Sequence, residues 1–188
     1  SMSTSQSTAI AGVYIATGAT KGSTRVYMYG GTGFYEGQLN ATGFTARGTS
    51  TTGANFVGFT QFDNMVIASG GGEFRLRRQT IGATSNFSAL SATAPYADIV
   101  SIVNRFVVAG SLYEDEGGGT ISNLRSNVIS WSGIDDPDNW PTPNSATAIA
   151  VQSGEQELLE RYGAVVGIHG SDQHAVILQR GAITRMTY

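Results

Sequence analysis

The residues most able to carry chemistry are two histidines separated by a short turn. His169 and His174 are the only histidines of the chain, and Asp172 lies between them. Two imidazoles and a carboxylate at this spacing have the ligand types of a zinc site. Ordinary surface histidines are far commoner than such sites, so we interpret both as surface residues and predict no metal.

A group of acidic residues lies between the two tryptophans of the chain. Asp135, Asp136 and Asp138, with Asn139, offer the oxygen ligands that Ca²⁺ prefers. The segment lacks the glycine and the bidentate glutamate of an EF-hand loop, and Asp-Asp-Pro-Asp-Asn is equally typical of a turn. We therefore interpret it as a turn, and the acidic residues 114–116 as a solvated hairpin tip.

Nothing in the sequence indicates a catalytic nucleophile. The chain contains no cysteine, which excludes both a disulfide framework and a thiolate metal site. No Gly-x-Ser-x-Gly motif occurs, and a strand-rich pattern offers no strand–turn–helix that would hold one. We predict that the protein is not an enzyme and has no cofactor.

Basic residues form one tight cluster, Arg75, Arg77 and Arg78. The formal net charge is −3, so the chain has no large basic surface for nucleic acid. Arg75 and Arg77 are two residues apart and fall on one face of a predicted strand. We interpret the three as solvated or paired arginines, with contact to a polyanion such as DNA as the alternative.

A short pattern that occurs four times predicts the elements that position these residues. Each copy is an apolar run with a glycine, and the copies begin at residues 26, 65, 106 and 175, at spacings of 39, 41 and 69. The first two spacings approach the ~40–45 residues of a four-stranded propeller blade, and the third indicates a blade with an insertion. A shift of 41 residues also places Asp63 on Asn104 and Ala68 on Ala109.

Composition agrees with a fold made of strands. Charged residues are 13% of the chain, about half the ~25% typical of soluble domains, while strand-forming Val, Ile, Thr, Tyr and Phe are plentiful. We predict an all-β fold of about four β-propeller blades, as a fragment of a larger propeller, with a β-sandwich as the alternative.

The predicted organisation is simple. Residues 1–8 are expected to be a flexible N-terminus that opens with a cloning scar, and residues 9–188 a single β-propeller-like domain or partial propeller. A helix is expected at residues 153–161, where Ser153 and Gln156 fit a capping box. A long loop is expected between the strands at 106–109 and 127–132.

The most unusual segment is NVISWSGIDDPDNW, residues 127–140. A strand ends at Trp131 and Ser132, Asp136 and Pro137 favour a turn, and Trp140 can then fold back on the sheet. From the residues alone we predict a turn stapled by two indoles.

This segment resembles the signature of a family of short-tailed bacteriophage virion proteins, the packaged-DNA stabilisation or tail-hub proteins and related propeller-containing tail components. The resemblance continues in residues 163–188, with weaker similarity at 21–34 and 62–70. Members of the family are longer than this chain. The resemblance implies a structural virion protein of a phage or prophage tail, produced in the bacterial cytoplasm, that joins subunits and helps retain packaged DNA, with no catalytic residues.

The same interpretation predicts the partners. We expect other virion or tail subunits and a homo-oligomer, in which a second copy covers the open edge of the blades. No apolar run approaches the ~18–20 residues that cross a bilayer, so no membrane partner is expected. A carbohydrate-binding adhesion module, with exposed tyrosines and tryptophans that stack on sugars, is the alternative function, and a hydrolase on a propeller scaffold is the third.

Overall fold

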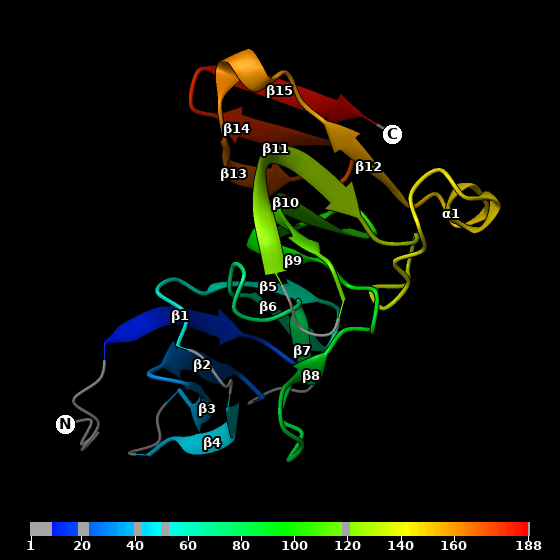
Figure 1. The fold of residues 1–188 in the computed structure, drawn as a ribbon. Coiled ribbons are helices and arrows are strands. Elements are labelled where there is room, and N and C mark those ends of the chain that lie inside the picture. Colours follow the sequence, from blue (N-terminus) through cyan, green and yellow to red (C-terminus); the bar gives the residue numbers. More distant parts are fainter. Residues whose placement is uncertain (1–8, 19–22, 40–42, 50–52, 118–120, 188) are drawn as a thin grey trace.

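The chain folds into four small antiparallel sheets, and each sheet is built from strands that follow one another in sequence (Figure 1). The computed structural model describes residues 9–18, 23–39, 43–49, 53–117 and 121–187. The all-β prediction is confirmed. The predicted N-terminal segment, residues 1–8, lies outside the described residues.

The strands of each sheet run up and down in chain order. Sheet 1 contains β1 (Ile10–Ala16), β2 (Arg25–Gly30), β3 (Gly33–Gln38) and β4 (Thr45–Thr49). Sheet 2 contains β5 (Gly58–Phe62), β6 (Met65–Ser69), β7 (Arg77–Thr80) and β8 (Ser88–Ala89). Sheet 3 contains β9 (Tyr96–Val103), β10 (Phe106–Asp115), β11 (Ile121–Trp131) and β12 (Gly154–Glu157). Sheet 4 contains β13 (Val165–Gly170), β14 (His174–Gln179) and β15 (Ala182–Thr187).

The four copies of the sequence pattern are the second strands of the four sheets. Residues 26, 65, 106 and 175 lie in β2, β6, β10 and β14. The aligned turn residues also match, because Asp63 and Asn104 both adopt positive φ, 48° and 53°, in two-residue hairpin loops. A primed hairpin turn requires positive φ, which Asp and Asn tolerate better than most residues. The predicted repeat is therefore a structural repeat.

Neighbouring sheets stack through their first strands. β1 contacts β5, β5 contacts β9, and β9 contacts β13. Backbone hydrogen bonds join the sheets at these contacts, from Val57 N–H to the Ala11 carbonyl (3.0 Å) and from Asn104 N–H to the Ser171 carbonyl (3.0 Å). The sheets consequently form a row, with sheet 1 at one end and sheet 4 at the other (Figure 1).

The core fills the spaces between consecutive sheets. In β6, Val66 and Ala68 pack toward sheet 1, whereas Ile67 packs toward sheet 3. Both faces of this strand are buried, which explains its unbroken apolar run. The space between sheets 1 and 2 is mainly aromatic, and the ring centroids of Phe34 and Phe87 lie 4.3 Å apart.

The prediction of a helix at residues 153–161 is wrong. Residues Gly154–Glu157 are strand β12, which pairs with the end of β11, and a single 3-10 turn follows at Glu160–Tyr162. Ser153 does not cap a helix, because its hydroxyl donates to the Trp131 carbonyl (2.9 Å). The short helix α1 (Ala146–Ala150) lies earlier, capped by the Ser145 side chain.

The long loop predicted after residue 109 is also wrong. β10 and β11 continue past it as a long hairpin. The glycine at residue 110 precedes a bulge instead of a turn, since the register shifts between Gly110 and Leu112 and Ser111 has a φ of 59°. A bulge of this kind bends a strand without ending it.

Substitution of Gly170 tests how closely β13 and β9 approach each other. A Cβ at this position would overlap the carbonyl group of Ile102 in β9. We expect Gly170→Ala to lower the free energy of unfolding by about 1–3 kcal/mol, as overpacked sites do, in urea-induced unfolding. Gly43→Ala is the matched control, because no atom lies within 4 Å of a Cβ built there. Equal stability of the two variants would contradict the close approach.

Candidate functional site

Trp131 fastens β12 to the end of β11. Its indole N–H donates to the Gln152 carbonyl (2.8 Å), just before β12 begins. The indole also lies against the backbone of Gly154, where it leaves no room for a Cβ. Trp131 thus joins the two ends of the segment between β11 and β12, which contains α1.

Ser132 ties the start of the turn to β10. The side chain is fully buried, and its Oγ accepts a hydrogen bond from Val107 N–H (3.1 Å) and donates one to the Gly133 carbonyl (3.0 Å). Ser132 N–H donates to the Val107 carbonyl as well (3.0 Å). The hydroxyl is fully used in structural contacts and is not placed as a nucleophile.

The acidic turn is held by its own side chains. Asp136 Oδ1 accepts a hydrogen bond from Asp138 N–H (3.2 Å), and Pro137 is buried. Trp140 is 5% exposed in the core between sheets 2 and 3, and its indole N–H donates to the Pro137 carbonyl (2.8 Å). The predicted turn is present and Trp140 folds back onto it, but the second indole was wrongly predicted, because Trp131 binds residue 152 and not the turn.

The aspartates of this turn have separate partners. Asp135 forms an ion pair with Arg105, and Asp138 forms one with Arg78 at 3.0 Å. Burial raises the pKa of the Asp138 carboxyl. In the part of the chain that the structure describes, no three His, Asp or Glu residues are grouped so that they could hold a metal ion.

The two histidines lie on neighbouring strands of sheet 4. His169 in β13 is exposed, and His174 begins β14 with its Nδ1 3.3 Å from the Ser171 hydroxyl. Asp172 is exposed in the turn between them.

The clustered arginines reach different neighbours. Arg75 donates to the Ala94 carbonyl (2.8 Å), pairs with Asp115 and lies 4.8 Å from the ring centroid of Tyr96. The end of β10 is therefore tied to the segment before β7 through this pair. Arg75 precedes β7, so it does not share a strand face with Arg77 as predicted.

The other two arginines point to sheets 1 and 3. Arg77 Nη1 donates to the carbonyl of Thr49 at the end of β4 (3.3 Å), and burial lowers the pKa of Arg77. Arg78 joins β7 to the turn after β11 through Asp138. The structure thus brings together Arg78 of the arginine cluster and Asp138 of the acidic turn. The sequence analysis did not predict this contact.

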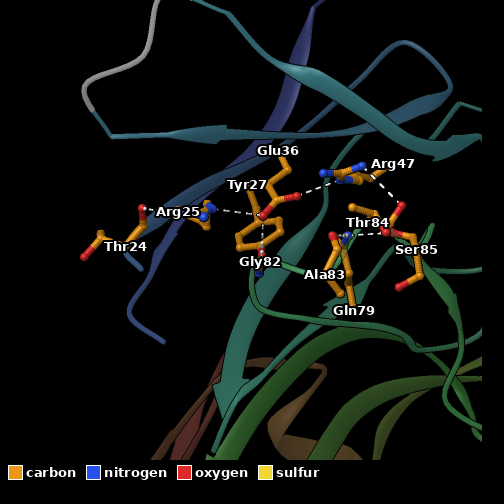
Figure 2. A network of polar contacts seen from close by, with 10 residues as sticks. All are labelled: Thr24, Arg25, Tyr27, Glu36, Arg47, Gln79, Gly82, Ala83, Thr84 and Ser85. Atoms are coloured by element: carbon orange, nitrogen blue, oxygen red, sulfur yellow. Dashed lines mark hydrogen bonds and ion pairs between the residues drawn. The ribbon is translucent and has the colours of Figure 1, made fainter. Parts of the chain in front are cut away.

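A second polar site was missed by the sequence analysis (Figure 2). Glu36 in β3 is 4% exposed. Its Oε2 accepts from Arg47 Nε (2.6 Å), and its Oε1 accepts from the Tyr27 hydroxyl (3.2 Å) and lies 3.4 Å from Arg25 Nε. Figure 2 shows the two guanidiniums on either side of the carboxylate. The sequence signal was a single acidic residue within an otherwise apolar and glycine-rich strand.

No family model matches the chain, and none of the curated proteins is significantly similar to it.

Within the described residues, no helix is long and apolar enough to cross a membrane.

Removal of the Trp140 side chain tests the structural role of the turn. Trp140→Ala leaves a large cavity in the core and should lower the free energy of unfolding by about 3–5 kcal/mol. Trp131→Ala is the comparison, since that indole is only half buried, and its cost should be smaller. Urea unfolding followed by circular dichroism measures both. The interpretation fails if Trp140→Ala is no more costly than Trp131→Ala.

Tyr27 gives the protein a distinct response to alkaline pH. Burial raises the pKa of Tyr27 from 10.0 to about 12; the hydrogen bond with Gly82 N–H acts in the opposite direction, and the negative charge of Glu36 adds to the rise. The unfolded chain releases this proton near pH 10, whereas the folded chain retains it, so stability falls as pH rises from 10 to about 12. Unfolding free energies measured across this range should fall more steeply for the wild type than for Tyr27→Phe. Parallel curves would contradict the burial of the neutral phenol.

Proposed function

We propose that the chain is a structural, non-catalytic part of a β-propeller in a phage or prophage tail or head–tail hub. One observation carries the proposal: four consecutive up-and-down sheets stack through their first strands. Consecutive blades of a propeller pack in this way, with the first strand of each blade nearest the axis. The Trp131–Trp140 turn, which carries the family resemblance, joins two of these sheets.

The role of such a protein in the virion is mechanical. Rigid sheets present loops at their edges, and these loops can join neighbouring subunits and help retain packaged DNA. A net charge of −3 favours contact through shape and polar loops over a basic surface that binds DNA phosphates. Paired Arg75 and Arg78 fit this view, because their charges are already balanced by Asp115 and Asp138.

The ends of the row explain why partners are expected. On sheet 1, Val13 and Ile15 of β1 are 59% and 56% exposed, and on sheet 4, Leu178 and Ile183 are 40% and 76% exposed. In the middle of the row the equivalent faces are covered by the next sheet. A repeated sheet of this kind buries its faces only against neighbours. A second copy, stacked end to end, would cover both faces.

A carbohydrate-binding module is the second candidate. Trp140 has no exposed face for a sugar ring, since it is 5% exposed. Trp131 borders a groove of about 380 Å³ between sheets 3 and 4, together with Leu158 and Met186. This groove is the feature of the described residues that favours glycan binding.

Mass spectrometry of purified phage particles is the direct test of the proposed location. Peptides of this chain should be present at a stoichiometry typical of a tail or hub component. A glycan array run with the wild type and Trp131→Ala separates the second candidate. Sugar binding that Trp131→Ala abolishes, without loss of folding, would replace the virion proposal with the lectin.

The end-to-end contact predicts a concentration-dependent oligomer. Ile183→Asp and Val13→Asp each place a charge on an exposed apolar sheet face and should shift the protein to monomers in light-scattering measurements after gel filtration. Ile149→Asp is the matched control, because Ile149 is 72% exposed on α1, away from both faces. A wild type that stays monomeric at high concentration would contradict the contact.

A further inference from the structure

We infer that the cavity beside Glu36 binds a small oxyanion, a carboxylate or phosphate group, through Arg25 and Arg47. The inference is independent of the proposed place in a virion, because it depends only on sheet 1 and the segment after β7.

The cavity is a polar hollow at the edge of sheet 1, with a volume of about 290 Å³. Three glycines, Gly37, Gly43 and Gly82, form part of its wall. A Cβ built at Gly43 would meet no atom within 4 Å, and one at Gly82 would meet only Arg25 Nη2, at 3.7 Å. Gln38 and Thr45 add polar side chains to the lining. A space of this size holds a group as large as phosphate together with water.

The Glu36 carboxylate holds each guanidinium at its Nε atom, with a different oxygen for each. Arg47 Nε lies 2.6 Å from Oε2, and Arg25 Nε lies 3.4 Å from Oε1. The Nη1 atoms donate to backbone carbonyls, of Thr24 (3.3 Å) and of Thr84 (3.2 Å). These contacts fix each guanidinium plane and leave the Nη2 atoms without a hydrogen bond to any described residue. An arginine fixed in this way is prepared for an oxyanion, since its planar donors match carboxylate and phosphate oxygens.

The charges around the cavity favour an anion. Two guanidiniums face one carboxylate, and Glu36 is the one acidic side chain among the described residues that line the space. The Arg25 and Arg47 side chains are 20% and 16% exposed, and that of Glu36 is 3% exposed. Water screens such largely buried groups less than it screens surface charges, so the excess positive charge acts strongly on a bound ligand.

Titration of the ¹⁵N-labelled protein with phosphate, sulfate, malonate and acetate, each at constant ionic strength, tests the inference by nuclear magnetic resonance. We expect saturable shifts of the backbone amides of Gly43, Thr45 and Gly82, with one dissociation constant for each active anion. Arg25→Gln and Arg47→Gln should each weaken binding about tenfold or more, as loss of a charged hydrogen-bond donor does. Arg185→Gln is the control with the same charge change, on exposed β15.

Thr45→Tyr keeps the test decisive if the arginine variants unfold. Thr45 is exposed and pairs with Glu36 in the sheet register, so a tyrosine there fills the mouth of the cavity without removing an ion pair. It should abolish the shifts while the fold persists, because aromatic residues suit strands. Preference for phosphate over malonate would identify a phosphate ligand, and the reverse a carboxylate. The absence of saturable shifts with all four anions, or equal weakening by Arg185→Gln, would overturn the inference.

Discussion

The close approach of the first strands of consecutive sheets is the constraint on which the whole structure depends. At Gly12 and Gly170 the backbone of one sheet comes so near the next that a Cβ would overlap a carbonyl group, of Val57 and of Ile102. This spacing lets backbone hydrogen bonds join the sheets directly. Because the first strands are fixed, the second strands of the two inner sheets bury both of their faces. This burial requires consecutive apolar residues, which explains the apolar repeat in the sequence.

Local signals were sufficient to predict the repeat and its turns. Positive φ at Asp63 and Asn104 follows from the side chains themselves, and period-two alternation needs no knowledge of the rest of the molecule. The prediction of a helix at residues 153–161 failed because the deciding contact is distant in sequence. The Ser153 hydroxyl, which would have capped a helix, donates instead to the carbonyl of Trp131, 22 residues earlier in the chain. The loop predicted after residue 109 was wrong for a local reason, since Gly110 and Ser111 suit a bulge as well as a turn.

The contacts of the candidate sites also divide into local ones, which the sequence predicts, and distant ones, which it does not. Trp140 and Pro137 lie three residues apart, so the stapled turn was predictable from spacing alone. The partners of Arg75 and Arg78 belong to the neighbouring sheet, and their choice depends on how the sheets stack. The Glu36 network combines side chains from three strands of sheet 1. Alternation places Tyr27 opposite Glu36 once the register is known, but the sequence does not fix which strands pair or in what register.

Stability alone gives a poor account of the Glu36 network. A buried carboxylate between two guanidiniums loses hydration on folding, and replacement of such a triad by apolar residues is often neutral or stabilising. The neighbouring aromatic core, with Tyr27 against Phe87, shows that sheet 1 can pack apolar groups at this depth. Two arginines and a glutamate at the edge of that core, with arginine Nη2 donors that no described residue accepts from, are better explained by recognition of an anion. The same rigidity that the close strands give to the row would then hold the two arginines ready for their ligand.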